Sequence, residues 1–281
     1  MGVFSWLRTV LLATVWLAAT AAHAEPAISA RSAILFDART GKVLYKKNEN
    51  LRMPVASTQK LLTALLVVEG GDLEKMVTIT SSDTQAEPTK LYLKPGERYS
   101  RRVLTTALLV KSPNDVARAL ARDHSGSVSA FAAAMNARIR RLGGNDSNFV
   151  NPNGLPAEGQ YSTARDMARV ARAAYQNPAI REMVRTKYYT FRFSSGRTLS
   201  LRNTNRVLRT YSFCNGMKTG YTNASGHCLI SSGSYNGRDV IAVVLGSNKA
   251  NVWPESTALL AYGLGLSEAQ VNALRIDSAS N

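Results

Sequence analysis

The chain has 281 residues, and its hydrophobic content of 45% and charged content of 19% are those of a globular protein with room for a sizeable core. The excess of 35 Lys and Arg over 19 Asp and Glu gives a formal net charge of +16. This charge would be attracted to an anionic matrix, although a basic surface kept for solubility is the alternative. Because the basic residues are scattered and carry no interleaved aromatic platform, the sequence predicts no nucleic-acid partner.

Residues 1 to 24 have the three-part pattern of a secretory signal, with one charge at Arg8, an apolar run, and Ala22-His23-Ala24 at the end. We expect cleavage after Ala24, export to the periplasm or cell wall space, and no stable membrane anchor afterwards. The apolar stretch is short for a membrane span, which needs roughly 20 residues. An uncleaved N-terminal anchor stays open as the alternative.

The first predicted elements are two short strands over residues 33 to 45, around a turn at 39 to 42. A buried helix is expected to begin near Val55, because residues 57 to 68 are almost unbroken in helix formers. The chain from 73 to 99 is mixed and rich in turns.

The middle of the chain reads as helical. A second apolar helix over 102 to 111 is expected to stop at Ser112-Pro113-Asn114, because a residue before proline disfavours the helical conformation. The remaining predicted elements of this region are a helix from Asp115, a helix over 128 to 142, a long loop over 149 to 163 and a helix over 163 to 175.

The last third reads mostly as strand. Residues 188 to 201 and 227 to 247 predict two hairpins, the second around an Asn236-Gly237 turn, and residues 255 to 265 predict a closing helix. Strands at both ends with helices between them fit one sheet assembled from distant parts of the chain, with an inserted helical region.

Ser57 and Lys60 form the first candidate site. Positions three apart share a helix face, so a lysine one turn after a serine can reach its hydroxyl. Burial and a second positive charge nearby would lower the pKa of Lys60, leaving a neutral amine able to take the proton of Ser57. The backbone N–H of Ser57, at the end of the helix, can stabilise a negative oxygen. A Ser-x-x-Lys arises about once by chance in a chain of this length, so the pair alone is weak evidence.

Two later motifs strengthen the interpretation. Ser112-Pro113-Asn114 offers a hydroxyl and an amide on a constrained turn, although a helix stop would explain it equally well. Lys218-Thr219-Gly220 offers an ammonium, a hydroxyl and a glycine on a predicted strand, where the glycine allows close approach to the backbone. The ordered set is the known signature of penicillin-binding proteins and class A β-lactamases.

The chain resembles the low-molecular-weight penicillin-binding proteins, which are serine D-Ala-D-Ala carboxypeptidases and endopeptidases. The likeness runs from about residue 28 to 250 and includes "FDARTGKVLYKKN", "NFVNPNGLPAEGQYSTARDMARVA" and "NGMKTGYTNASGHCLI". It implies a β-lactamase/transpeptidase-like α/β fold, with an antiparallel five-stranded sheet flanked by helices and an inserted, mostly helical subdomain. It also implies a catalytic domain over 25 to 265 and a C-terminal tail over 266 to 281.

The resemblance implies a role for each site residue. Ser57 would be the acylated nucleophile, Lys60 its general base, and Ser112 a proton relay toward the leaving amine. The residues expected to bind substrate are Asn114 at the amide, Lys218 and Thr219 at the terminal carboxylate, Gly220, and Tyr221 through its backbone N–H in the oxyanion hole.

The implied substrates are stem peptides of peptidoglycan, cleaved at D-Ala-D-Ala termini or D-amino-acid cross-links through an acyl-serine, with β-lactams as inhibitors and no cofactor. Pro113 departs from the family, where glycine is common. The alternatives are a β-lactamase, for which Glu158 is the candidate acid, a non-catalytic peptidoglycan-binding module, and a Ser-His-Asp hydrolase using His124 or His227. The choice between carboxypeptidase and endopeptidase stays open.

The only cysteines, Cys214 and Cys228, flank a predicted hairpin. In an exported protein such a pair can form a disulfide, and the sequence leaves this open. The number of Cys and His residues and their spacing do not suggest a metal site.

Overall fold

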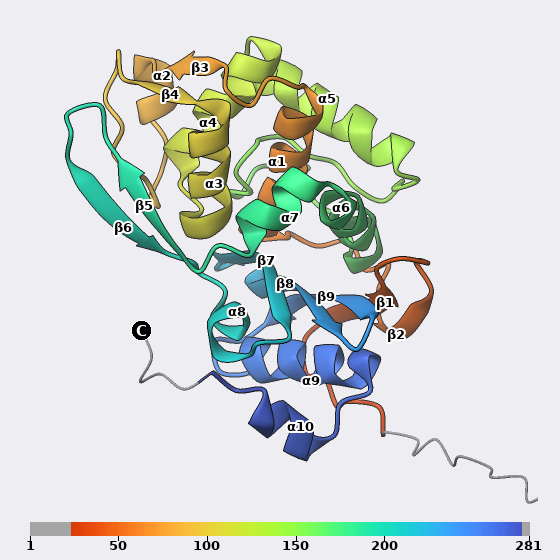
Figure 1. Cartoon of the computed structure of the whole chain (residues 1–281). Coiled ribbons are helices and arrows are strands. Elements are labelled where there is room, and N and C mark those ends of the chain that lie inside the picture. The colour runs from red at the N-terminus through yellow and green to blue at the C-terminus, as the bar shows by residue number, and fades with distance from the viewer. Residues whose placement is uncertain (1–23, 277–281) are drawn as a thin grey trace, which may run out of the picture.

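The computed structural model describes residues 24–276, so the predicted signal segment, apart from Ala24, lies outside the described residues. The molecule is built around a five-stranded antiparallel sheet (Figure 1). In spatial order its strands are β2 (Val43–Lys47), β1 (Ser32–Asp37), β9 (Arg238–Ser247), β8 (Gly226–Tyr235) and β7 (Cys214–Thr222). The start of the chain therefore pairs with its last third, which confirms the predicted sheet and leaves β7 at one edge.

Helices cover both faces of this sheet (Figure 1). On one side lie α1 (Lys60–Glu69), α3 (Arg101–Lys111), α4 (Asn114–Ser125), α5 (Val128–Arg141), α6 (Ala164–Gln176) and α7 (Pro178–Val184). On the other side lie α9 (Val252–Leu264) and α10 (Glu268–Ala273), with α8 (Arg206–Thr210) leading into β7.

Smaller elements complete the inserted region. They are η1 (Ala56–Gln59), β3 (Met76–Thr78), α2 (Ser81–Thr84), β4 (Arg98–Ser100) and the hairpin of β5 (Tyr188–Arg192) and β6 (Thr198–Arg202). The longer predicted helices and both predicted hairpins are confirmed. The short helices α7, α8 and α10 were not predicted, because segments of five to seven residues carry too little periodicity to be recognised.

The central strands β1 and β9 are buried on both faces, and their side chains alternate between two cores. The side chains that face α1 and its neighbours include Ile34, Phe36, Ile241, Val243 and Leu245. Those that face α9 include Ala33, Leu35, Val240, Ala242 and Val244. Because both faces are covered, these strands appear in the sequence as continuous apolar runs.

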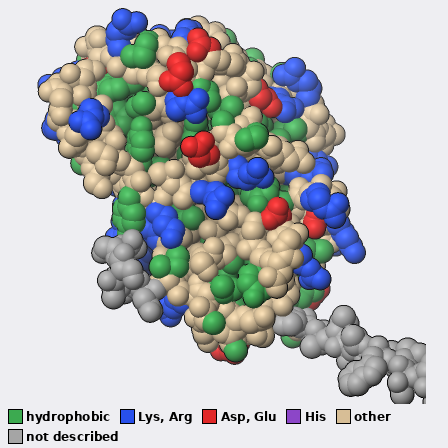
Figure 2. All heavy atoms as spheres, viewed as in Figure 1, with side chains coloured by type: hydrophobic (Ala, Val, Ile, Leu, Met, Phe, Trp, Pro, Cys, Tyr) green, Lys and Arg blue, Asp and Glu red, His purple; other side chains and the backbone are tan. Residues whose placement is uncertain are grey.

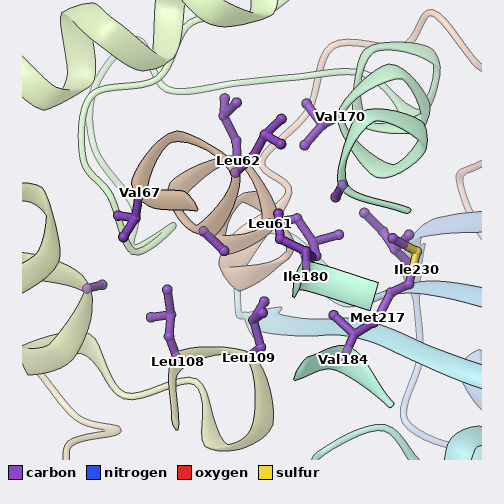
Figure 3. Packing of buried hydrophobic residues seen from close by; sticks show 14 of the residues in the cluster. Leu61, Leu62, Val67, Leu108, Leu109, Val170, Ile180, Val184, Met217 and Ile230 are labelled. Carbon is purple, nitrogen blue, oxygen red and sulfur yellow. The ribbon is translucent and has the colours of Figure 1, made fainter. Parts of the chain in front are cut away.

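Helix α1 lies at the centre of the larger core (Figure 3). Leu61 and Leu62 are fully buried, and Figure 3 shows them surrounded by side chains from α3, α6, α7, β7 and β8. Replacing such a residue by alanine typically costs 2–5 kcal/mol. Since α1 is buried nearly all round, its first residue, Lys60, is held in a fixed environment.

The cysteines do not meet. Cys214 is opposite Gly233 in the β7–β8 ladder, whereas Cys228 is opposite Gly220. Their side chains also belong to different cores, Cys214 to the α9 side and Cys228 to the α1 side. Both are free and buried, and the sheet between them excludes the bridge that the sequence left open.

The chain after α9 returns to the body of the protein. The backbone N–H of Ile276 donates to the carbonyl of Thr210 at 2.8 Å, and that of Ser212 donates to Leu274 at 2.9 Å. Within residues 24–276, none of the helices combines the length and the apolar character needed to cross a membrane.

Candidate active site

Ser57 lies in η1, a tight turn that leads directly into α1. Two glycines allow this turn to pack closely. A Cβ on Gly154 would lie 2.1 Å from the carbonyl oxygen of Ala56, and one on Gly220 would lie 2.8 Å from the backbone nitrogen of Ser57. Neither position can therefore carry a side chain without moving the turn. Gly220 thus allows β7 to approach η1 closely. We call the space beside Ser57, between η1 and β7, the active-site cleft.

Lys60 is fully buried, and its Nζ has three oxygen neighbours. Ser57 Oγ lies at 2.8 Å, Asn114 Oδ1 at 2.7 Å and the carbonyl oxygen of Asn153 at 2.7 Å. The amide and backbone carbonyls can only accept, so they take two N–H bonds from the amine. A neutral amine then has one lone pair left, and it points to the Ser57 hydroxyl.

The electrostatics favour this neutral form. Burial lowers the pKa of Lys60 well below its ordinary value, the positive charge of Lys218 lowers it further, and Asp115 opposes the shift. Asp115 does not contact the amine; its carboxylate accepts from the backbone N–H groups of Leu91 and Leu93. The pKa depression that the sequence suggested is therefore present, with both of the expected causes.

Lys218 is the second buried amine of the site. Burial lowers its pKa to about 7, and its Nζ donates to the carbonyl of Thr219 at 3.0 Å. The Thr219 hydroxyl donates to the hydroxyl of Thr204 at 2.7 Å. Lys218 therefore loses its proton more readily than an exposed lysine does.

The turn between α3 and α4 carries the second motif. Ser112 ends α3 in the left-handed conformation, with φ of 68°, and Pro113 caps α4. Asn114, the first residue of α4, donates from Nδ2 to the carbonyls of Glu87 (2.9 Å) and Pro88 (3.1 Å) while its Oδ1 accepts from Lys60. The Asn114 amide thus orients Lys60. The Ser112 hydroxyl makes no hydrogen bond with another residue of the 24–276 range.

Tyr221 follows Gly220 on β7, and its side chain is 56% exposed. Its ring lies over that of His227, with centroids 4.4 Å apart, and its hydroxyl donates to Asn223. His227 is opposite Tyr221 on β8. The imidazole therefore packs under the rim of the cleft, and no hydrogen bond joins it to Ser57.

Two contributors to the site were not predicted. The carbonyl of Asn153 accepts from Lys60, and Ser57 Oγ lies 3.1 Å from the same oxygen. Thr204, between β6 and α8, holds the Thr219 hydroxyl. A backbone carbonyl leaves no residue-type signal; only the turn-forming "NPNG" marked that loop. Thr204 belongs to no short motif with Thr219, because 15 positions separate them.

A pocket of about 370 Å³ adjoins the nucleophile. Its walls include Val55 and Ala56 before Ser57, Pro156 and Glu158 of the long loop, and Thr222 beyond Tyr221. Glu158 is the charged residue in this lining. The pocket thus extends the cleft from the nucleophile past the end of β7.

Comparisons with known proteins agree with this geometry. Residues 18–249 match the family model described as D-alanyl-D-alanine carboxypeptidase. The chain is 35% identical over 229 residues to the D-alanyl-D-alanine carboxypeptidase DacF of Bacillus subtilis, covering 80% of this chain and 59% of the relative. It is 35% identical to the D-alanyl-D-alanine endopeptidase of Escherichia coli, covering 81% of this chain and 74% of that protein.

Solved structures give the same result for the fold. A D-alanyl-D-alanine carboxypeptidase from Mycobacterium tuberculosis superposes with a TM-score of 0.82 at 31% identity, covering 88% of this chain and 96% of that one. The Streptomyces K15 DD-transpeptidase gives a TM-score of 0.81 at 29% identity, covering 86% and 99%. The β-lactamase/transpeptidase-like architecture expected from the sequence is thereby confirmed.

Proposed function

The chain belongs to the D-alanyl-D-alanine carboxypeptidase family, and on that premise we propose that it is a serine DD-peptidase that hydrolyses D-Ala-D-Ala termini or D-amino-acid cross-links of peptidoglycan stem peptides. One observation carries the proposal. A buried amine with a lowered pKa lies 2.8 Å from a serine hydroxyl, and its other two neighbours can only accept hydrogen bonds. This is the arrangement of an activated nucleophile and its base.

In the acylation step, Lys60 takes the proton of the Ser57 hydroxyl as Oγ attacks the carbonyl of the penultimate D-alanine. The tetrahedral oxyanion is held by the backbone N–H groups of Ser57 and Tyr221. The C–N bond then breaks, and the proton reaches the leaving amine by way of Ser112. Water attacks the resulting ester with Lys60 again as base, which releases the peptide and restores Ser57.

The substrate's terminal carboxylate is assigned to Lys218 and Thr219. Lys218 supplies positive potential and the Thr219 hydroxyl supplies a donor, once it exchanges Thr204 for the substrate. Asn114 is assigned to the substrate amide and, through its Oδ1, to the orientation of Lys60. A β-lactam would enter the same cleft and acylate Ser57.

The pocket beside Ser57 is assigned to the amino side of the substrate. Consider a peptide extended along β7 with its terminal carboxylate at Thr219. Its three C-terminal residues span about 10 Å, so the third residue from the peptide's C-terminus would lie near Thr222. Glu158 lines this pocket together with small apolar residues such as Val55, Ala56 and Pro156. We expect the pocket to favour a substrate side chain with an aliphatic stem and a cationic end.

We propose further that residues 25–265 form the catalytic domain with 266–281 as a tail, that the protein is exported to the periplasm or cell wall space, and that the mature protein has no stable membrane anchor. The pattern of residues 1 to 24 and the family's substrate support this. Fractionation of cells with N-terminal sequencing of the mature protein tests it; retention of residue 1 on a membrane-bound protein would contradict it.

The central proposal is tested with labelled penicillin and purified peptidoglycan. Wild type should be labelled covalently and Ser57→Ala should not, while Ser82→Ala, a change at an exposed serine of α2, should be labelled normally. Loss of one terminal D-Ala from the products would indicate a carboxypeptidase, and conversion of dimers to monomers an endopeptidase. Equal labelling of wild type and Ser57→Ala would end the proposal, and rapid penicillin turnover would favour a β-lactamase.

A further inference from the structure

A basic pocket outside the Ser57 site lies where α8 meets the start of α9. It has a volume of about 390 Å³. We call it the arginine pocket and define it by Arg202, Arg206, Arg209, Tyr211 and Trp253. Figure 2 shows Lys and Arg side chains over much of the visible face of the protein, some of them adjoining. The arginine pocket differs in that three arginines line one cavity.

These arginines have no carboxylate partner among residues 24–276. No Asp or Glu of that range lines the pocket, and none of the three takes part in its salt bridges. Elsewhere Arg101 and Arg122 each bind an aspartate, at 2.6 and 2.8 Å. The pocket thus concentrates positive charge that the described part of the fold does not neutralise.

Arg209 is the innermost of the three. Its Nε is buried and has no hydrogen-bond partner, and a buried donor left unpaired is costly. Burial lowers the pKa of Arg209, the charges of Arg202 and Arg206 lower it further, and Tyr188 opposes the shift. A bound anion would satisfy the free N–H and relieve the repulsion among the guanidinium groups.

The aromatic wall holds one arginine in place. The guanidinium carbon of Arg206 lies 5.6 Å from the centroid of the Trp253 ring, which is the distance of a cation–π contact. Tyr211 is fixed by stacking on Phe213, with centroids 5.2 Å apart. Because these contacts are already made without a ligand, we expect little side-chain entropy to be lost on binding.

We propose that the arginine pocket binds a phosphate-bearing ligand. Guanidinium forks match the oxygens of phosphate in pairs, and a doubly charged group balances three unpaired arginines better than a single carboxylate does. The shared chemistry is the phosphate group, which either a soluble phosphate ester or a lipid headgroup can provide. This assignment does not depend on the activity of Ser57.

Trp253 makes the test direct. The chain has three tryptophans, Trp6, Trp16 and Trp253. The first two lie in the segment that we propose is cleaved, so protein that begins at Glu25 has one tryptophan, and it lies in the pocket. Titration of this protein with inorganic pyrophosphate at low salt should change its fluorescence saturably, and added salt should weaken binding. Arg209→Gln should weaken binding about tenfold or more, whereas Arg98→Gln, at an exposed arginine of β4, should not.

A second variant guards against misfolding. Arg202→Gln, at an exposed position, should also weaken pyrophosphate binding, while labelling of Ser57 by penicillin stays at the wild-type rate in both variants. Vesicles of phosphatidylglycerol and of phosphatidylcholine distinguish the sources. Binding to the first alone, lost in Arg209→Gln, identifies a lipid headgroup, and binding of pyrophosphate without either vesicle identifies a soluble phosphate.

Three results would overturn the proposal. The first is no saturable response to pyrophosphate. The second is equal affinity for citrate, which would make the pocket a general anion site. The third concerns the chain beyond Ile276, which carries Asp277. If pyrophosphate binds to a variant that ends at Ile276 but not to the full chain, carboxylates beyond Ile276 compete for the arginines, and the pocket does not bind a separate phosphate ligand.

Discussion

Two buried cationic groups on the same side of the sheet have opposite surroundings. Lys60 has two neutral acceptors, a hydroxyl and a second lysine in its neighbourhood. Arg101, at the start of α3, donates to the carboxylate of Asp123 at 2.6 Å, and Lys75 binds the other oxygen of that carboxylate at 2.9 Å. Both side chains are largely removed from water. Burial alone therefore does not decide whether a cation keeps its charge.

The difference is one of partners. The Arg101 charge is balanced by a carboxylate whose own pKa is lowered by the hydrogen bonds and charges of Lys75 and Arg101, against the effect of burial. Lys60 has no such partner, so the neutral form of its amine has a lower free energy in this site than the charged form. A structural ion pair and a general base thus arise from the same kind of burial, and the predictions below test this contrast.

The largest effect is expected for Lys60→Met. Removing the base should lower the rate of Ser57 acylation about 10³-fold or more, because the Asn153 carbonyl can accept a hydrogen bond from the hydroxyl but cannot take its proton. Stopped-flow or quenched labelling with a fluorescent penicillin measures this. Lys75→Met is the matched control, at an exposed lysine that binds a carboxylate. Comparable acylation by Lys60→Met and wild type would remove Lys60 from the mechanism.

Asn114→Asp would give Lys60 the kind of partner that Arg101 has. A carboxylate 2.7 Å from Nζ should raise the pKa of Lys60 and keep it protonated at neutral pH. We expect acylation near pH 7 to fall about 100-fold and the acidic limb of the pH profile to move to higher pH. An unchanged profile with a uniformly lower rate would contradict this reasoning.

Arg101→Met should act on stability. It leaves the largely buried Asp123 with the exposed Lys75 as its remaining partner, and breaking a buried pair typically costs about 3 kcal/mol. Urea unfolding measures the loss. Lys60→Met should show no such loss, because it removes a poorly solvated amine. If both variants lose the same stability, the contrast between the two cations is wrong.

The pH dependence of stability separates the two sites further. The pKa of Lys218 is about 7 in the folded protein against an ordinary value of 10.5, so between these values the unfolded chain binds more protons. The free energy of unfolding should therefore rise with pH across that window. Asp123 acts at the other end: its lowered pKa stabilises the fold above about pH 4, and this contribution is lost on acidification.

The matched variant for this pH dependence is Lys218→Met. At pH 7 the Lys218→Met variant should have a larger free energy of unfolding than wild type. This difference in the free energy of unfolding should shrink toward pH 10. Denaturation at several pH values measures both. A constant difference between the two proteins would show that Lys218 keeps its ordinary pKa.

The smallest effect is expected at the outer end of the cleft. Glu158→Gln should lower kcat/KM about fivefold for a D-Ala-D-Ala peptide with a free lysine at the preceding position, since an exposed ion pair contributes about 1 kcal/mol. The same peptide with its lysine acetylated should be cleaved equally by both proteins. Equal losses on the two peptides would show that Glu158 does not contact the cation.

Sequence patterns identified the candidate catalytic side chains better than the neighbouring groups that orient them. The spacing of Ser57 and Lys60 and the later Lys218-Thr219-Gly220 named side chains that the fold brings to one cleft. The carbonyl of Asn153 and the hydroxyl of Thr204 come from distant segments and leave no local signal. The sheet was predictable because its central strands β1 and β9 are apolar runs and an Asn236-Gly237 turn joins β8 to β9. Short helices such as α8 owe their form to packing.

The two thiols sit in separate cores, and burial raises the pKa of Cys214 to about 12 and that of Cys228 to about 11. Neither group offers a thiolate to reagents while the sheet is closed. The described fold therefore contains no disulfide that a reducing agent could break. A maleimide dye would react only with molecules whose strands have opened. The rate of labelling at Cys214 would therefore report opening of the core on the α9 side, and the rate at Cys228 opening of the core on the α1 side.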